Sequence, residues 1–430
     1  MDVIIRNGLV VTLDDTLGVV PQADVAIRGG AIAEIGPQLR ARAAEEVDAT
    51  DCIVMPGLVD AHRHLFSPLL RGCAVNASYE EYFQEVVLGY GASYTPDDTR
   101  AAMTLGTLES IDAGTTTIHA WEHNLLTPDH ADASVQAFLE SGVRGRFSYG
   151  PPNEPPTVDL DDLLRVRDRY FSSRAGEHCV DESGRVHLGL ATRGVEFGRP
   201  DIWTRELAWG RQHGFPLTAH VMEHAISELH QHDALGPDLL AIHAFRATPA
   251  ELERLLASGT PVCVAPPAMA RAGIGRSPVK EMLELGVPLS LSVDSTAGCD
   301  TADMFAVMRI AVLIERAVHA SVLAYRPEDA LRHATIGGAQ ALGIGAQTGT
   351  LTPGKRADVI VVRADGLNFV PLNAPEAQIV LCGQPRNVDA VFIDGVCRKR
   401  AGELVGRDVT AALTAAREAV DAVRSRVACA

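Results

Sequence analysis

The stretch that decides the fold is Ile53-Val54-Met55-Pro56-Gly57-Leu58-Val59-Asp60-Ala61-His62-Arg63-His64, an apolar run that ends in two histidines. Successive side chains of an extended strand alternate between faces, so His62 and His64 point the same way and Arg63 points opposite. Two imidazoles on one face at the end of a strand supply half of a metal site. The same spacing also occurs in unrelated histidines near a turn, so the rest of the chain has to decide between the two interpretations.

The composition narrows the class of protein. The chain has 430 residues, 47% of them hydrophobic, and a formal net charge of −17, which argues against nucleic acid or an anionic membrane as a partner. Neither a basic, apolar leader at the N-terminus nor a run of about 18 apolar residues is present. The eight cysteines include no C-x-x-C pair. In a large chain without a signal pattern, such cysteines are expected to be reduced thiols. We therefore expect a cytoplasmic protein.

Both ends of the chain are rich in short alternating strands. The period-2 pattern predicts strands near the N-terminus and again after residue 355, and it predicts one amphipathic helix close to the C-terminus. These elements predict a small composite β-sandwich domain formed by residues 1–55 and 355–405, followed by a C-terminal helix within 406–430. The predicted strands cover residues 3–5, 8–12, 23–27, 31–35, 358–362 and 388–395.

The middle of the chain, residues 56–354, alternates apolar strands with amphipathic helices. Such an alternation predicts an α/β fold, and eight strand–helix units predict a (β/α)₈ TIM barrel. The seven strands expected after the opening run cover residues 115–119, 144–149, 186–191, 216–220, 239–243, 261–265 and 288–294. The expected helices include residues 97–113, 132–141, 201–213, 249–258 and 279–285.

Several of these strands end in a side chain that binds metal ions. The opening strand ends in His62 and His64, and three later strands end in His220, His243 and Asp294. In a barrel of this kind the C-terminal ends of the strands carry the functional side chains. Four strands with such an ending are difficult to attribute to coincidence, and they predict a metal centre at this face of the barrel.

A set of motifs spread over nearly the whole chain resembles the amidohydrolase superfamily, most closely its cytosine deaminase and triazine hydrolase branch. The motifs are the opening run 54–64, Gly114-Thr115-Thr116-Thr117, His220-Val221-Met222-Glu223, Ile242-His243, Ser292-Val293-Asp294-Ser295 and Leu351-Thr352-Pro353-Gly354-Lys355-Arg356-Ala357-Asp358. The resemblance implies the same barrel with a composite β-sandwich of both termini.

The resemblance also implies a ligand set. Binuclear members of the superfamily carry a carboxylated lysine at the end of strand four, where this chain has Thr192-Arg193, and its three lysines, at 280, 355 and 399, lie elsewhere. Arginine stays protonated and is not carboxylated. We therefore expect one divalent ion held by His62, His64, His220 and Asp294. These ligands suit Zn²⁺ best, with Fe²⁺, Mn²⁺ and Co²⁺ as alternatives.

The same reasoning assigns roles to the remaining polar residues. Asp294 is expected to accept a proton from the attacking water, His243 to stabilise the developing anion, and Glu223 to carry a proton to the leaving group. Further side chains are candidates for contact with the substrate: His119, His123, Arg193, Tyr79 and Tyr149.

These roles predict a metal-dependent hydrolase that attacks an sp² carbon and deaminates an N-heterocycle or an amidine-like compound. Hydrolysis of a C–Cl, C–S or amide or urea C–N bond, a metal-dependent lyase step in secondary metabolism, and a scaffold without a metal are the alternatives. The segment after strand seven, Val264-Ala265-Pro266-Pro267-Ala268-Met269-Ala270-Arg271, is apolar where the deaminase branch is polar, so the substrate stays open. A homo-oligomer, a dimer or larger, is also expected.

Overall fold

The computed structural model describes residues 1–152, 157–174, 177–195 and 199–429. The chain divides into two units, and each combines segments that are far apart in the sequence. The first unit contains residues 1–61, 109–117 and 303–407, and the second contains residues 62–108, 118–302 and 408–430. Among the described residues, no helix has the length and apolar character that crossing a membrane requires.

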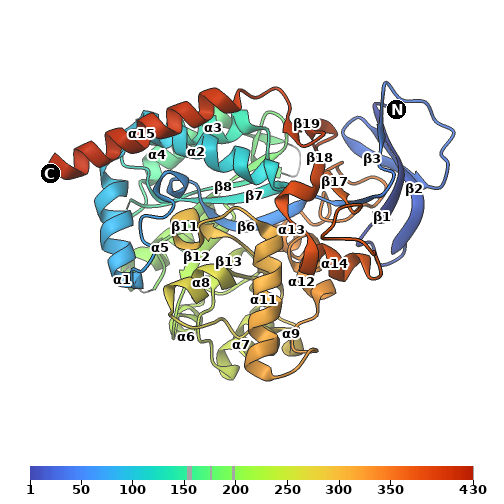
Figure 1. Cartoon of the computed structure of the whole chain (residues 1–430). Helices are drawn as coiled ribbons and strands as arrows, with labels where there is room; N and C mark the ends of the chain where they lie inside the picture. Colours follow the sequence, from blue (N-terminus) through green and yellow to red (C-terminus); the bar gives the residue numbers. More distant parts are fainter. Residues whose placement is uncertain (153–156, 175–176, 196–198, 430) are drawn as a thin grey trace. The chain divides into compact units, whose positions relative to one another are not determined.

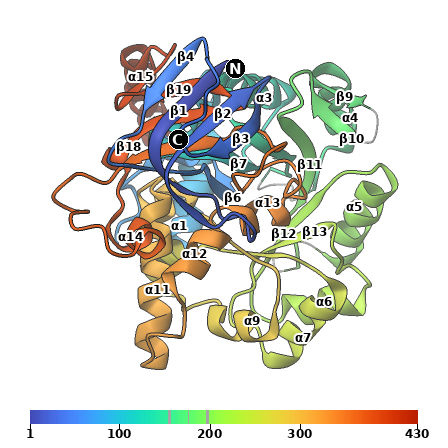
Figure 2. The ribbon, with the colours of Figure 1, turned by 90° about the vertical axis from the view of Figure 1, so that its right-hand side faces the viewer.

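The first unit is built on a nine-stranded sheet to which both ends of the chain contribute. The strand order is β20-β19-β18-β17-β5-β1-β2-β3, with β4 paired to β1. Figure 2 shows β18 and β19 in the same layer as β1 and β2. The strands are β1 Val3–Val11, β2 Val19–Arg28, β3 Ala31–Gly36, β4 Glu45–Asp48, β5 Cys52–Pro56, β17 Val359–Arg363, β18 Val388–Ile393, β19 Val396–Arg400 and β20 Glu403–Leu404.

Apolar side chains of the two chain ends share one core. Val10 and Val54 from the N-terminal strands pack with Val361 and Phe392 from the C-terminal strands, and all four are fully buried. The alternation that predicts the strands is the reason, because it places one apolar face of each strand on the same side of the sheet. The helices of this unit are α11 Met304–His319, α12 Pro327–His333, α13 Ile336–Ala341 and α14 Pro375–Cys382.

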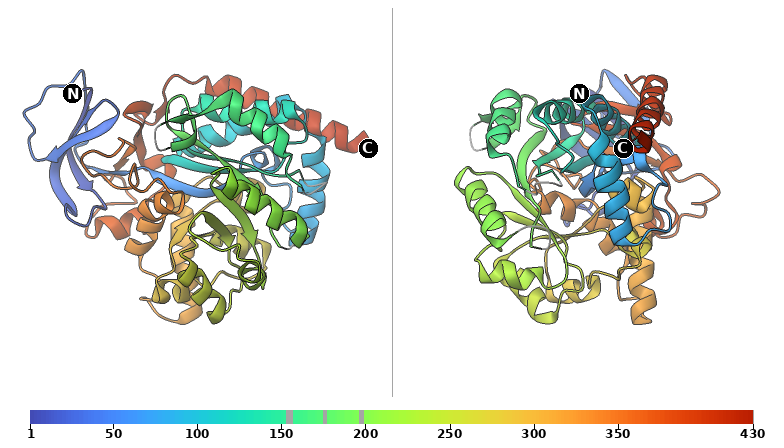
Figure 3. Two further views of the ribbon diagram at one scale, coloured as in Figure 1. Left: turned by 180° about the vertical axis from the view of Figure 1, so that it is seen from behind. Right: turned by 90° about the vertical axis from the view of Figure 1, so that its left-hand side faces the viewer.

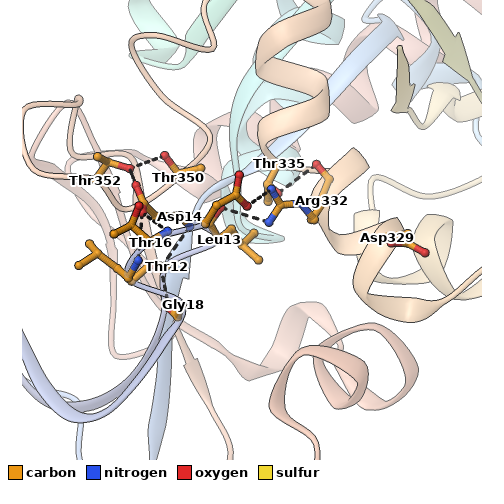
Figure 4. A network of polar contacts seen from close by, with 12 residues as sticks. Thr12, Leu13, Asp14, Thr16, Gly18, Asp329, Arg332, Thr335, Thr350 and Thr352 are labelled. Atoms are coloured by element: carbon orange, nitrogen blue, oxygen red, sulfur yellow. Dashed lines mark hydrogen bonds and ion pairs between the residues drawn. The ribbon is translucent and has the colours of Figure 1, made fainter. Parts of the chain in front are cut away.

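A network of polar contacts joins the turn after β1 to segments more than 300 residues later (Figure 4). The guanidinium of Arg332 donates to the carbonyl of Leu13 at 3.3 Å and to Asp15 at 2.7 Å. The hydroxyl of Thr352 donates to Asp14 at 2.6 Å. The motif that contains Thr352 therefore makes hydrogen bonds within the first unit, to the turn after β1. Its residues are not among those that line the candidate active site.

The second unit is organised by a curved parallel sheet with the order β15-β14-β13-β12-β11-β8-β7-β6-β16. Because β15 and β16 are separated by only Ser292 and Val293, the two ends of the strand order belong to neighbouring stretches of chain. The sheet therefore curls in the manner of a TIM barrel. Its strands are β6 Leu58–His64, β7 Thr115–Glu122, β8 Arg144–Tyr149, β11 Val186–Thr192, β12 Leu217–Val221, β13 Leu239–His243, β14 Val262–Val264, β15 Leu289–Leu291 and β16 Asp294–Ser295.

Helices follow most of these strands along the chain. Figures 2 and 3 show α5, α6 and α7 outside the strands β12 and β13. The strands predicted over 144–149 and 239–243, and the helices predicted over 249–258 and 279–285, have the predicted bounds. The helices are α1 Tyr79–Tyr82, α2 Pro96–Asp112, α3 Pro128–Ser141, α4 Leu160–Tyr170, α5 Pro200–Gln212, α6 Ala225–Gln231, α7 Pro249–Ser258, α8 Pro266–Ala272, α9 Val279–Leu285 and α10 Thr296–Cys299. Two short antiparallel strands, β9 Phe171–Arg174 and β10 Glu177–Asp181, extend the sheet beside β11.

The C-terminal helix α15, Val409–Cys429, is the long red helix of Figure 1. Its residues Ala416, Ala419 and Val423 are buried against Phe66 and Ala102. Arg426 donates to the carbonyl of Ser93 at 2.8 Å and pairs with Asp98. The helix therefore covers the segment that follows the two histidines of β6.

Candidate active site

Strand ends bring five predicted side chains together in the second unit. His62 and His64 lie at the end of β6, His220 lies near the end of β12, His243 ends β13 and Asp294 begins β16. These strands belong to one curled parallel sheet, in which β12 pairs with β13 and β6 pairs with β16, so the five side chains meet at the edge where β6, β12 and β13 end. The ring centroids of His62 and His64 are 4.6 Å apart, which agrees with the alternation that turns Arg63 to the opposite side.

The distances within this cluster suit a shared metal ion. Oδ1 of Asp294 lies 3.5 Å from Nε2 of His62 and 3.6 Å from Nε2 of His64. Two ligand atoms that are each about 2.0–2.1 Å from a tetrahedral Zn²⁺ ion lie about 3.4 Å from one another. Within this cluster, two groups of ligand atoms have all members within 4.8 Å of one another: His62, His64 and Asp294, and His62, His220 and His243.

His62 gives an independent test of the fit. Its side chain is fully buried, and neither of its ring nitrogens has a hydrogen-bond partner in the described part of the chain. A buried polar atom without a partner is costly, and such atoms are rare in folded proteins. A metal ion bound among these ligands would give a ring nitrogen of His62 a partner. The donor set therefore fits a divalent cation.

The protonation states of the clustered side chains also suit metal binding. Burial, together with the neighbouring imidazole of His62, lowers the pKa of His64 to about 3. Burial likewise lowers the pKa of His243 to about 4 and that of His220 well below its usual range. Burial alone would raise the pKa of Asp294, but the surrounding imidazoles outweigh burial and hold that pKa well below its usual range. At neutral pH His64, His220 and His243 are therefore neutral imidazoles and Asp294 is a carboxylate, which are the forms that bind metals.

Hydrogen bonds and backbone geometry orient the ligand atoms. Nδ1 of His64 lies 2.9 Å from the carbonyl of Trp121, so that contact occupies Nδ1 and leaves Nε2 to face Asp294. Such an outer contact fixes the orientation of a metal-binding imidazole. Asp294 and His243 have φ angles of +72° and +80°, in the left-handed region that residues other than glycine seldom adopt. Backbone strain of this kind is concentrated at functional sites.

A cavity of about 810 Å³, which includes its open mouth, lies over the cluster. Its wall combines the metal-binding candidates with aromatic, apolar and cationic side chains. The lining contains His64, His220, His243, Asp294, His123, Arg193, Tyr79, Tyr82, Phe83, Met222, Met269, Arg271, Ile274 and Ser295.

Three of the five predicted substrate-contact residues line this cavity, namely His123, Arg193 and Tyr79. The other two are outside the lining. Nε2 of His119 lies 2.9 Å from the hydroxyl of Ser148, among fully buried side chains. The hydroxyl of Tyr149 donates to Asp162 at 2.8 Å, which turns it toward helix α4. These two contacts give His119 and Tyr149 structural partners.

Glu223 does not line the cavity either in this conformation. Its side chain is 44% exposed and lies 3.4 Å from the guanidinium of Arg246. Glu223 follows His220 by three residues as predicted, but its carboxylate pairs with Arg246 and is not among the cavity-lining groups. Its assignment to proton transfer stays a prediction.

Sequence reasoning overlooked several wall residues. Met222, Met269, Arg271, Ile274 and Phe83 line the cavity and were not among the predicted residues. The hydroxyl of Tyr82 donates to Ser295 at 2.8 Å, beside Asp294. The apolar composition of residues 264–271 was the available signal for Met269, whereas no motif marks Phe83.

The fold and the cluster define a TIM-like α/β protein with a candidate metal centre at the C-terminal edge of its parallel strands. More specifically, the chain belongs to the amidohydrolase family, whose model matches residues 53–397. This match confirms the resemblance inferred from the motifs.

Curated relatives align over almost the full length. A 5-methylthioadenosine/S-adenosylhomocysteine deaminase of Syntrophobacter fumaroxidans is 29% identical over 92% of this chain and 92% of that protein. A 5'-deoxyadenosine deaminase of Methanosarcina mazei is 27% identical over 99% of both.

Solved structures show the same fold. An adenosine deaminase from Xanthomonas campestris with bound zinc has a TM-score of 0.89 and 23% identity, covering 99% of both chains. An atrazine chlorohydrolase from Arthrobacter aurescens in complex with zinc has a TM-score of 0.87 and 20% identity, covering 97% of this chain and 100% of that one.

Proposed function

We propose that this protein is a metal-dependent deaminase that hydrolyses the exocyclic C–N bond of an N-heterocycle, in particular of an adenine nucleoside. The observation that carries the proposal is the approach of Asp294 Oδ1 to within 3.6 Å of both His62 and His64 at the cavity. The full-length alignment with deaminases of 5-methylthioadenosine, S-adenosylhomocysteine and 5'-deoxyadenosine supports this substrate class.

One divalent ion, with Zn²⁺ as our first choice, would be held by His62, His64, His220 and Asp294. When bound, such an ion lowers the pKa of water to about 7. Single occupancy is supported by the lysines: Lys280 pairs with Glu284, Lys355 donates to the carbonyl of Gly345, and Lys399 pairs with Asp112. Each is thereby engaged outside the described cavity lining.

Three residues of the chain would carry out the proton transfers and stabilise the developing charge. The carboxylate of Asp294, ionised because the imidazoles lower its pKa, accepts the proton of the attacking water. His243 lies 3.9 Å from Oδ2 of Asp294 and lines the cavity, so it can donate a hydrogen bond to the anion that develops on the substrate as water attacks. Glu223 leaves Arg246 and relays the proton released by the attacking water to the amino group of the substrate, which then departs as ammonia.

Hydrolysis of a C–Cl or C–S bond is the second candidate. It is favoured by the wall of Met222, Met269 and Ile274, which offers an apolar leaving group or substituent a nonpolar surface. The same ligands would serve either reaction, because both begin with attack of water on an electron-poor ring carbon.

The decisive experiment incubates zinc-reconstituted protein with 5'-methylthioadenosine, S-adenosylhomocysteine, 5'-deoxyadenosine and a chlorotriazine. Ammonia, chloride and thiol release are followed separately. We expect ammonia from at least one nucleoside, and no release with Asp294→Ala. Release of chloride or thiol without ammonia would replace the first proposal by the second.

For the architecture we propose a complete (β/α)₈ barrel over residues 56–354, a composite β-sandwich of residues 1–55 and 355–405, and a C-terminal helix within 406–430. The curled order of the parallel sheet and the shared sheet of both chain ends support this division. We also propose a homo-oligomer, which size-exclusion chromatography with light scattering tests directly.

A further inference from the structure

Arg63 stands between the two candidate ligands of β6 and is fully buried. Its side chain leaves the strand on the face opposite His62 and His64, so it does not enter the cavity. Nη2 of Arg63 donates to the hydroxyl of Thr296 at 3.1 Å. A buried guanidinium is costly unless it is well paired, so a packing role alone is better filled by an apolar side chain.

The partner of Arg63 lies two residues beyond Asp294. The backbone N–H of Thr296 donates to the hydroxyl of Ser67 at 2.8 Å, and that hydroxyl donates to the carbonyl of His64 at 2.6 Å. Thr296 is thus held at its side chain by Arg63 and at its backbone by Ser67. Both contacts come from β6 and the turn that follows it.

These contacts surround the least regular point of the sheet. Strand β15 ends at Leu291, β16 contains only Asp294 and Ser295, and Asp294 has a φ angle of +72°. Asp294 pairs in register with Arg63, and Ser295 pairs with His64. A two-residue strand with a strained first residue needs further support to hold a carboxylate at a fixed place.

We propose that Arg63 is a positioning residue for the metal centre: through Thr296 it fixes the segment that carries Asp294 against β6. The carboxylate is thereby kept at 3.5 Å from His62 and 3.6 Å from His64. This inference rests on the proposed metal site. It adds that a side chain outside the cavity sets the affinity of that site.

The test measures zinc affinity of the full-length protein by competition with a chromophoric chelator. It compares the wild type with Arg63→Met, Thr296→Val and the double variant. Loss of an outer contact of a metal site costs roughly 10- to 100-fold in affinity. We expect a loss of this size in each single variant, and no loss in the double variant beyond that of Arg63→Met, because Arg63→Met already removes the contact with Thr296.

Arg144 provides the matched control. It is as deeply buried as Arg63, with 1% exposure, but it begins β8 and so lies at the opposite end of the strands from the cavity. Arg144→Met should lower the melting temperature and leave zinc affinity unchanged. Should Arg63→Met fail to fold, the nearly isosteric Thr296→Val decides the question alone.

The outcomes separate this inference from the proposed function. Wild-type protein that does not bind zinc overturns both. Tight wild-type binding with unchanged affinity in Thr296→Val overturns the role of Arg63 alone. Independent, additive losses in the double variant, or an equal loss in Arg144→Met, would show that the effect does not pass through Thr296.

Discussion

Nη1 of Arg246 lies 3.4 Å from Oε2 of Glu223, so a surface guanidinium holds the carboxylate that the sequence assigns to proton transfer. Both side chains are about half exposed. An exposed ion pair contributes only about 0.2–1 kcal/mol. The pair is therefore weak enough for Glu223 to turn toward a bound substrate at little cost.

Replacing Glu223 by Gln tests this role. Because general acid–base catalysis contributes about 10²- to 10⁴-fold, we expect kcat to fall by at least 100-fold in steady-state assays of ammonia release. Zinc affinity should be unchanged, since Glu223 lies outside the ligand cluster. Arg246→Gln is the control for the pair itself, and its kcat/KM should change less than about fivefold. A Glu223→Gln enzyme with full activity would exclude the shuttle.

Removal of the metal is expected to affect stability as well as activity. Binding of an ion to the folded state alone adds about 4 kcal/mol to the free energy of unfolding at a free concentration of 1,000 times the Kd. Treatment with a chelator should lower the melting temperature and abolish turnover, and added Zn²⁺ should restore both. In Asp294→Asn the stabilisation by added zinc should be smaller. Equal melting temperatures with and without zinc would argue against the site.

The apolar wall predicts a preference for substrates with an apolar substituent. Met269 is buried, and it lines the cavity from α8. Because one methylene group in a pocket is worth about 10- to 200-fold in discrimination, Met269→Gln should raise the KM for 5'-methylthioadenosine by about tenfold. The KM for adenosine should change less, and zinc affinity should stay constant. Equal effects on both substrates would place Met269 away from the substituent.

The stability of the protein should decline in mild acid. Burial lowers the pKa of His333 to about 4, against about 6.5 in an unfolded chain, and its Nδ1 lies 2.8 Å from the hydroxyl of Tyr325. Between these two values the unfolded chain binds more protons, so stability falls as the pH drops from about 6.5 toward 4. The fall in melting temperature between pH 7.5 and pH 5 should be smaller in His333→Gln than in the wild type. The exposed His230→Gln variant should behave like the wild type.

Much of the fold follows from local pattern. Residues 239–243 are an apolar run and residues 249–258 an amphipathic one, and both have the predicted bounds as β13 and α7. The continuous run 3–11 was predicted as two short strands, because Asn7-Gly8 has the composition of a turn; the chain bulges there and continues as β1. Pairing with a neighbouring strand thus outweighed the local turn signal.

The candidate ligands could be located because parallel strands end at one edge, whatever the connecting segments do. The positions of side chains beyond the strand ends could be predicted less accurately from the sequence. Strand β7 continues to Glu122, three residues past the predicted end, so His119 lies inside the sheet and His123 reaches the cavity. The ion-pair partner of Glu223 is Arg246, which lies 23 residues later in the chain. No local sequence pattern contains that contact.

The broken eighth strand has a consequence for the way in which the protein matures. His62 and His64 emerge early from the ribosome, whereas their neighbour Asp294 is made 230 residues later, so the full ligand set cannot exist on a short nascent chain. Contacts of such long sequence separation form slowly, because the loop between them must close first. At about 5–20 residues per second, synthesis alone separates the two halves of the cluster by about 10–50 seconds. The proposed four-ligand site can therefore be completed only late in synthesis, after the segment that carries Asp294 has been made.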